Sequence, residues 1–331
     1  MKRRTVIILL SALSGMLVLI FDGKTASDGI RLGIDMCLQT LIPSLFPFFV
    51  LSGIITASIL GQPISCIRPI GRFMHMPSGS ESLFAVGILG GYPVGAGTVW
   101  SAYHNGKITE SEANRLAIFC NNAGPSFIFG ILGQLFPAKF YVWFLWAVQI
   151  LSAILTGYLL RGQHRDSTID ISSNISIDSI LNRSIRNMAT VCGWVILFRM
   201  LLEFLNRWFF WLMKPELQVL VSGFLELSNG CLRLLDVTNV AMRFLIASVM
   251  LSFGGLCILM QTQSVFPSLI MKEYLTGKMI HLAISTILSL AVVSALSGQL
   301  LLSFFLLTML IIGIAISTKA NRKRKLAVAI P

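Results

Sequence analysis

Two clusters of glycine, proline and amide residues interrupt apolar stretches of this chain. The first is Gly90-Gly91-Tyr92-Pro93-Val94-Gly95, and the second is Asn121-Asn122-Ala123-Gly124-Pro125. Helix breaks and amides are costly in lipid, because the freed backbone groups find no water to bond. They persist where the broken backbone lines a cavity that is enclosed by protein or filled with water. The two clusters therefore indicate a candidate binding site inside a membrane domain.

Composition supports a membrane-embedded chain. Of its 331 residues, 55% are hydrophobic and only 12% are charged, whereas a soluble domain carries roughly 25% charged residues. This length accommodates about eight to ten transmembrane or re-entrant helices of roughly 20 residues each. We expect an all-α, polytopic membrane protein built from two related repeats with broken helices.

The net charge of +12 comes largely from short basic stretches beside apolar runs. These stretches are Lys2 to Arg4, Arg161 to Arg165, Arg183 to Arg186 and Arg322 to Lys325. The positive-inside rule accounts for such clusters on the cytoplasmic side of a membrane. Contact with anionic lipid follows from the same charges. The lipid bilayer is therefore the expected partner, and nucleic acid is not.

The chain divides into four predicted segments. They are a first membrane half at 1–160, a polar cytoplasmic linker at 161–186, a second membrane half at 187–317 and a basic cytoplasmic tail at 318–331.

Three elements of the first half are predicted to be re-entrant or broken, at 34–60, 82–102 and 115–135. The first contains Pro43 and Pro47, and each proline removes a helical hydrogen bond and clashes one turn back. The third is preceded by Thr109 and Glu112, whose capping-box pattern predicts a helix start.

The predicted membrane crossings do not place the N-terminus and the basic tail on the same side of the membrane. Four plain crossings after residue 212 place the basic tail on the outer side, against the positive-inside rule. A re-entrant element near 207–230 in the second half would return the tail to the cytoplasm.

The second half echoes the first. Gly87-Ile88-Leu89-Gly90 resembles Gly223-Phe224-Leu225-Glu226, and about 30 residues later each half meets a second break. In the second half that break is Ser252-Phe253-Gly254-Gly255. Paired breaks at corresponding places are typical of transporters built from repeats. The alternative is that glycine-rich apolar sequence matches itself by chance.

Polar residues at these breaks are the candidate binding residues. Asn121 and Asn122 offer donors and acceptors that suit a neutral ligand, and Glu226 lies between apolar residues at a helix break. The predicted substrate-binding set is Gly90, Gly91, Tyr92, Pro93, Gly95, Asn121, Asn122, Gly124, Pro125, Glu226, Ser228, Asn229, Gly254 and Gly255. The alternatives are interhelical hydrogen bonds or backbone capping for the two amides, and an interfacial position for Glu226.

Two further groups of polar residues carry less weight. Arg199 and Glu203 are four residues apart on one helix, which is typical of a structural ion pair. Gln261 and Gln263 extend the second break and are weaker binding candidates.

Sequence signatures of enzymes and metal sites are missing. The chain contains no G-x-S-x-G, no Walker loop and no H-E-x-x-H. Its six cysteines and four histidines show no ligand spacing. We expect no catalytic residues, no metal and no cofactor.

Several motifs together resemble one family. They are Gly90 to Ala96, Lys107 to Ala113, Phe119 to Ile128, Leu41 to Pro47 and Ser252 to Leu256. With these motifs the chain is similar to the YlbJ family of sporulation integral membrane proteins, which carry the Gate, or nucleoside-recognition, domain. That domain is shared with spore maturation proteins and concentrative nucleoside transporters. The chain departs from the family at Cys257, Ile258 and Leu259, where a small hydroxyl residue and a histidine-containing run are expected.

The resemblance implies a multi-pass protein of the bacterial cell membrane with a role in sporulation. We expect a secondary-transporter-like carrier or gate for a small polar, nucleoside-like solute. The alternative is a non-transporting scaffold that assembles other sporulation membrane proteins during spore envelope or cortex formation. An intramembrane enzyme has little support, because no paired nucleophile and base can be identified.

Overall fold

The computed structural model describes residues 3–59, 64–161 and 176–328, and every regular element in those ranges is a helix. Six helical stretches within them are long and apolar enough to cross a membrane. These are Gly23–Ile59, Lys139–Leu159, Ile177–Trp208, Val240–Val265, Met271–Leu296 and Leu300–Thr318. The predicted all-α, polytopic membrane fold is confirmed.

The first long stretch corrects the prediction of a break at 34–60. After α1 (Arg3–Phe21), helix α2 (Gly23–Met36) continues through a π-helical turn, η1 (Cys37–Leu41), into α3 (Ile42–Ile59). The wide turn of η1 lies just before Pro43, where it relieves the clash that proline causes one turn back. The prolines therefore distort this helix without breaking it.

The next element is a helical hairpin. After the short helix α4 (Arg68–Phe73), α5 (Glu81–Gly90) and α6 (Val94–His104) pack against each other. The tip is the Gly90–Pro93 region, where Gly91 has φ +70° and the Tyr92–Pro93 peptide bond is cis. Segment 82–102, which the sequence predicted as re-entrant or broken, is thus interrupted and turned back on itself.

A broken helix and a long helix complete the first half. Helix α7 (Glu110–Cys120) begins at the predicted capping box, in which Thr109 N donates to Glu112 Oε2 at 2.8 Å. It ends at Asn121, and α8 (Pro125–Gly130) follows after the second cluster. A 3₁₀ turn, η2 (Leu132–Gln134), leads into α9 (Lys139–Leu159).

The second half begins earlier than predicted. Helix α10 (Ile177–Trp208) starts inside the predicted linker, because Ser176 caps it by accepting a hydrogen bond from Ser179 N. Residues 162–175 of that linker lie outside the described ranges. The predicted boundary at residue 187 is therefore about three turns too late.

A second hairpin and a second broken helix follow. After the 3₁₀ turn η3 (Phe210–Leu212), the second hairpin consists of α11 (Pro215–Leu225) and α12 (Leu227–Leu232). The 3₁₀ turn η4 (Arg233–Asp236) then leads into the second broken helix, which consists of α13 (Val240–Phe253) and α14 (Gly255–Val265). Helices α15 (Met271–Leu296) and α16 (Leu300–Val328) end the chain. Helix α16 runs through most of the predicted tail at 318–331, of which residues 329–331 lie outside the described ranges.

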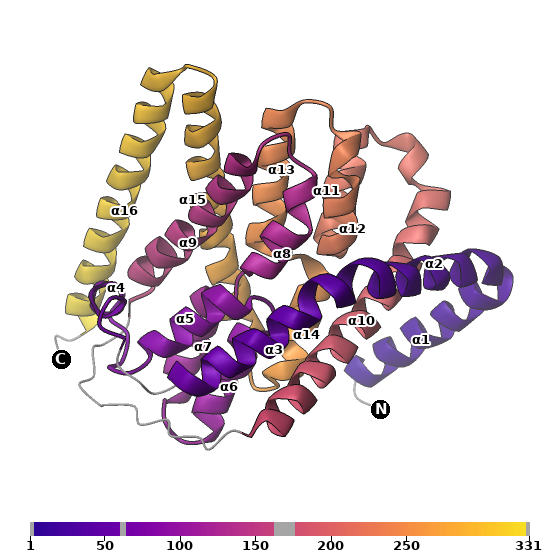
Figure 1. The fold of residues 1–331 in the computed structure, drawn as a ribbon, viewed down its shortest axis with the longest axis horizontal. Coiled ribbons are helices and arrows are strands. Elements are labelled where there is room, and N and C mark those ends of the chain that lie inside the picture. Colours follow the sequence, from indigo (N-terminus) through magenta and orange to yellow (C-terminus); the bar gives the residue numbers. More distant parts are fainter. Residues whose placement is uncertain (1–2, 60–63, 162–175, 329–331) are drawn as a thin grey trace.

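The two halves show the same succession of elements in opposite orientation (Figure 1). Each has a hairpin, then a broken helix, then a long helix. The α5/α6 hairpin opens toward the bottom of the view and the α11/α12 hairpin opens toward the top. Both tips therefore point to the middle of the molecule.

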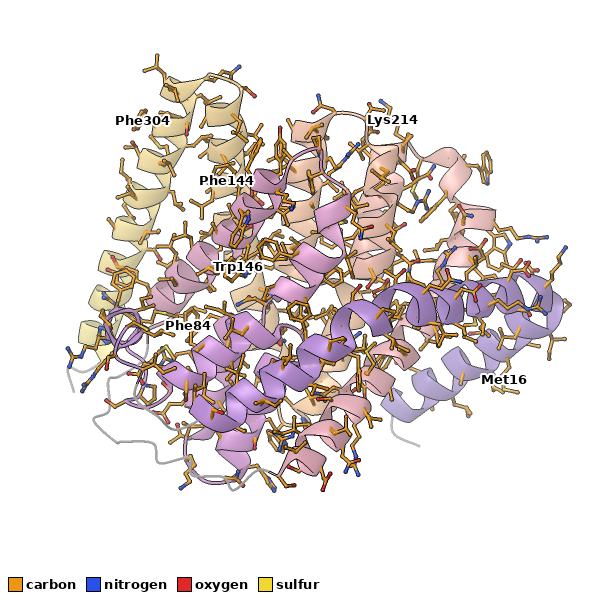
Figure 2. The ribbon with its side chains drawn as sticks, in the orientation of Figure 1. Met16, Phe84, Phe144, Trp146, Lys214 and Phe304 are labelled. Carbon is orange, nitrogen blue, oxygen red and sulfur yellow. The ribbon has the colours of Figure 1, made fainter. Side chains whose placement is uncertain are left out.

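Helix α10 packs along α2 and α3, and these three helices form one side of the molecule. The lipid-facing character of the outermost helices is visible in Figure 2, where Met16 on α1 and Phe304 on α16 lie at the edges of the bundle. Their side chains are 59% and 67% exposed, which a lipid environment accommodates.

One face of the protein carries α4, the end of α9, the start of α10 and the end of α16 (lower side in Figure 1). We call it the linker face. From there the second half crosses four times, with α10, α13–α14, α15 and α16, while α11 and α12 return to the opposite face. This hairpin lies where the topology needed a re-entrant element. The basic segments at 161, 183–186 and 322–325 then share one side, which the positive-inside rule assigns to the cytoplasm.

The native thiol of Cys66 tests this orientation. Cys66 is exposed beside α4 on the linker face, whereas the other five cysteines are buried or half-buried. A membrane-impermeant maleimide should label inverted membrane vesicles and leave intact cells unlabelled, and Cys66→Ser should remove the labelling. Adding Ser297→Cys, between α15 and α16, to Cys66→Ser should restore labelling from outside. Labelling of Cys66 in intact cells would contradict the assignment.

Candidate functional site

Each hairpin tip lies against the helix break that follows it in the chain. A Cβ atom on Gly91 would come within 2.7 Å of Gly124 N, so the first tip meets the α7–α8 break through bare backbone. A Cβ atom on Gly255 would come within 2.7 Å of Gly223 O, so the second tip meets the α13–α14 break in the same way. Side chains at these positions would force the elements apart.

A small cavity of about 30 Å³ lies between the two tips. Polar atoms reach it from Ser126, Glu226, Ser228 and Gln261, and helices α3 and α10 close it with apolar side chains. That volume holds about two water molecules. The space between the tips is therefore too small for a solute larger than water in this structure.

Glu226 is the acidic residue of this cavity, and its side chain caps α12. Its Oε1 accepts a hydrogen bond from Ser228 N at 3.0 Å, and its Oε2 accepts from Asn229 N and Asn229 Nδ2 at 2.7 Å each. The residue is only 1% exposed. The buried carboxylate is therefore well supplied with donors from the first turn of α12.

Gln261 on α14 provides a second acceptor. Its Nε2 donates to Cys257 Sγ at 3.2 Å, but its Oε1 is buried without a hydrogen-bond partner. Buried polar atoms are usually paired, and an orphan indicates a missing water or ligand donor. The cavity therefore presents acceptors that suit a ligand rich in N–H or O–H groups.

The amides of Asn121 and Asn122 bind the protein and do not line this cavity. Asn121 Oδ1 accepts from Ala96 N at 3.3 Å, and its Nδ2 donates to Thr262 Oγ1 and Tyr274 OH at 3.0 Å. Asn122 Nδ2 donates to Phe119 O at 2.7 Å. These contacts match the alternative prediction of interhelical bonding and backbone capping.

The remaining predicted site residues divide into three groups. Those that line the central cavity are Gly90, Gly91, Tyr92, Gly124, Glu226 and Ser228. Pro93 and Asn229 line separate hollows on the two sides of the cavity. The others serve the breaks themselves: Gly95 packs on Cys120 O, Pro125 begins α8, and Gly254 and Gly255 connect α13 to α14 with positive φ angles.

Lys278 is the residue that the sequence analysis missed. It lies on α15, is fully buried, and its Nζ donates to Asn121 O, to Asn122 Oδ1 at 3.0 Å and to Tyr92 OH at 3.3 Å. A lysine inside a long apolar helix is itself a signal of function. The predicted site was based on the glycine and asparagine residues at the helix breaks, and it did not include this isolated cation.

Two larger hollows flank the central cavity. One has a volume of about 470 Å³ and lies between η1, α10 and the α11/α12 hairpin, with Asp35, Arg199 and Asn229 in its wall. The other has about 260 Å³ and lies between α3, α6 and α10, with Pro93 and Arg183 in its wall. We call them the opposite-face vestibule and the linker-face vestibule.

Helix α10 connects the three spaces. Residues 180–187 line the linker-face vestibule, 191 and 195 the central cavity, and 199–206 the opposite-face vestibule. The α2–α3 helix lines them in the reverse order, with residues 49–53, 45 and 32–40. The spaces therefore form a column along the α3/α10 side of the protein, closed at the hairpin tips.

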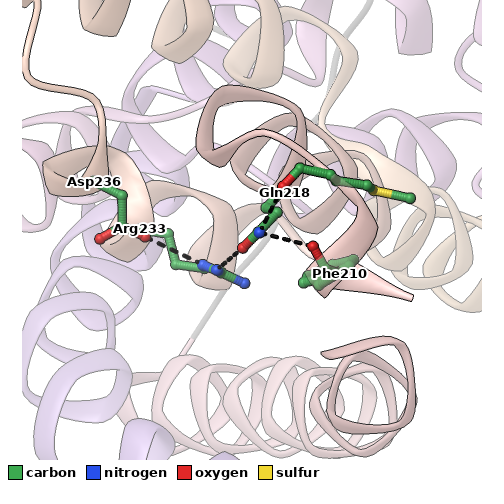
Figure 3. Close-up of polar contacts among 5 residues, drawn as sticks. Phe210, Gln218, Arg233 and Asp236 are labelled. Atoms are coloured by element: carbon green, nitrogen blue, oxygen red, sulfur yellow. Dashed lines mark hydrogen bonds and ion pairs between the residues drawn. The ribbon is translucent and has the colours of Figure 1, made fainter. Parts of the chain in front are cut away.

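The outer ends of the second hairpin are tied together beside the opposite-face vestibule (Figure 3). Arg233 Nη2 donates to Gln218 Oε1 at 2.6 Å, and Gln218 Nε2 donates to Phe210 O at 2.8 Å. Arg233 also pairs with Asp236 at 3.4 Å. In the same vestibule wall, Arg199 pairs with Glu203 at 3.0 Å, as the spacing predicted.

Comparison with known proteins supports the resemblance to the YlbJ family. A stretch of 114 residues is 32% identical to the sporulation integral membrane protein YlbJ of Bacillus subtilis (strain 168). The match covers 32% of this chain and 27% of that protein, so it spans about a quarter of the relative's length. No family model and no solved structure matches the chain. The chain is an integral membrane protein, and over this stretch it is similar to a protein that is named for sporulation.

The contact between the legs of the second hairpin gives a stability prediction. A Cβ atom on Gly230 would lie 2.2 Å from Gly223 Cα, so Gly230→Ala must separate α11 from α12. We expect a loss of about 1–3 kcal/mol in the free energy of unfolding, seen as a lower melting temperature in detergent. Gly193→Ala in α10 is the control, because nothing lies within 4 Å of its added Cβ. Equal melting temperatures for the two variants would contradict the tight hairpin.

Proposed function

We propose that this protein is a carrier for a small polar solute that binds between the tips of its two hairpins. The observation that supports this most directly is the pair of acceptors, Glu226 and the unpartnered Gln261 Oε1, at a buried cavity between the tips. Burying a carboxylate and an orphan amide oxygen costs free energy. A ligand that donates hydrogen bonds would offset that cost.

The column of spaces along α10 supports movement of the solute as well as binding. Vestibules on opposite faces approach the central cavity, and each includes a residue of one hairpin tip, Pro93 or Asn229. Opening the first hairpin would connect the cavity to the linker face, and opening the second would connect it to the opposite face. This arrangement fits alternating access around a fixed site between repeats.

The lining of the cavity restricts the class of solute. Glu226 and Gln261 present oxygen acceptors, so the solute carries N–H or O–H donors there and no anionic group. A nucleoside meets this requirement through its sugar hydroxyls and base amino groups, and the family resemblance points to the same class. We propose the cell membrane of a bacterium as the location and sporulation as the setting, in keeping with the YlbJ relative.

One observation favours the alternative of a non-transporting scaffold. The amides of Asn121 and Asn122 are bonded within the protein, and the closed cavity holds only about two waters. The breaks would then shape the packing of the bundle. A scaffold predicts co-purifying sporulation membrane proteins and no solute flux in liposomes, whereas the carrier predicts flux from the purified protein alone.

The transport assay compares three variants in liposomes with a panel of nucleosides. Glu226→Gln removes the negative charge and Gln261→Ala removes the orphan acceptor, and we expect each to lower uptake at least tenfold, the effect of about 1.4 kcal/mol. Glu216→Gln, an exposed glutamate on the same hairpin, should leave uptake unchanged.

Two results would each contradict a part of this proposal. Absence of uptake for every nucleoside removes the nucleoside class. Uptake that persists unchanged in both Glu226→Gln and Gln261→Ala removes the binding site between the tips.

A further inference from the structure

The ammonium group of Lys278 lies where α7 ends and the chain unwinds. Lys278 is fully buried, and its Nζ donates to three oxygens: Asn121 O, Asn122 Oδ1 and Tyr92 OH. Asn121 is the residue that terminates α7. The carboxyl end of an eleven-residue helix carries partial negative charge, which favours a cation at this point.

All three oxygens belong to neutral groups. Among the described residues, Lys278 has no ion pair with a carboxylate, and the rings of Tyr92 and Tyr274 lie 5.1 and 5.6 Å from its Nζ. A buried charge without a counter-ion depends entirely on such dipoles and ring faces. The surroundings of the ammonium are therefore built for a cation and contain no compensating anion.

This ligand set also suits a small metal cation. Backbone carbonyls of unwound helices and the carboxyl ends of half-helices coordinate Na⁺ in transporters built from repeats. Carbonyl oxygens replace the hydration shell of monovalent cations in channels. The ammonium, with three N–H donors, matches three oxygens in number.

We propose that Lys278 is a built-in cation that fills a monovalent cation site at the α7 break, so that no exchangeable metal ion is needed there. The tethered ammonium holds the first hairpin tip, because Tyr92 OH receives the Lys278 donor and itself donates to Leu251 O at 3.2 Å on α13. The charge thus links the first hairpin, the α7–α8 break, α13 and α15. Lys278 does not line the solute cavity, so this inference stands or fails independently of the proposed carrier function.

Removing the side chain should convert the site into one that binds a free cation. We would measure melting temperatures of purified protein in choline chloride and in NaCl, LiCl, KCl and methylammonium chloride at equal ionic strength. The wild type should melt at the same temperature in all five salts. Lys278→Ala should melt lower in choline and regain about 5 °C in NaCl, LiCl or methylammonium chloride at a hundredfold excess over the dissociation constant.

Two further variants complete the design. Lys272→Ala removes an exposed lysine from the same helix and should show neither the loss nor the regain. Lys278→Ser adds a hydroxyl oxygen to the vacated set and should regain more in NaCl than Lys278→Ala does. If either Lys278 variant folds only when it is purified in one of the small cations, that result also supports the proposal.

Three results would overturn it. One is a saturable stabilisation of the wild type by Na⁺ over choline that Lys278→Ala abolishes. Another is a folded Lys278→Ala whose melting temperature does not respond to any of the small cations. The third is failure of both Lys278 variants to fold in every salt, since a free cation then cannot replace the ammonium.

Discussion

The structure depends on satisfying, within the protein, the backbone groups that its helix breaks set free. Lipid supplies no hydrogen bonds, so each break needs partners from neighbouring helices. The α7 break is held by Asn121, Asn122 and Lys278, and the α12 start is capped by Glu226. The end of α13 receives a hydrogen bond from Tyr92 at Leu251 O. The α7 and α13 breaks thus take partners from the other half of the chain, whereas the α12 start is capped within its own hairpin.

Lys278 and Glu226, two of the buried charged residues, have different tasks in this arrangement. Lys278 lies at the carboxyl end of α7 and Glu226 at the amino end of α12, the ends that favour a cation and an anion respectively. The Lys278 ammonium donates its hydrogen bonds to oxygens of the protein, and so it rigidifies the first hairpin tip. The Glu226 carboxylate belongs to the wall of the central cavity together with Gln261, whose Oε1 has no hydrogen-bond partner.

Much of this fold could be predicted from residue patterns, because long apolar helices and capping boxes are local signals. The break positions at Gly90–Gly95 and Asn121–Pro125 mark where α5 and α7 end. Local rules failed for Pro43, because the π-helical turn just upstream accommodates it, and for Pro47, which lies inside α3 without ending it. They also placed α10 ten residues late, since Ser176 and the polar first turns of that helix read as linker.

The site was harder to predict than the fold, because it depends on which neighbours each polar group finds. The sequence does not show that the Asn121 amide donates hydrogen bonds to Thr262 and Tyr274, or that Gln261 Oε1 has no hydrogen-bond partner. Lys278 was detectable as a charge in an apolar run. Its role required the spatial meeting of residues that are more than 150 positions apart.

Protection of a thiol at the cavity measures solute binding between the hairpin tips most directly. Val195→Cys, at a position that lines the cavity without supplying an acceptor, would be introduced together with Cys66→Ser, and its alkylation rate in membranes compared with and without a transported solute. A solute bound between the tips should slow this reaction at least tenfold and leave the exposed Ser297→Cys unaffected. Equal alkylation rates at Val195→Cys, with a solute that the protein demonstrably transports, would contradict a binding site between the tips.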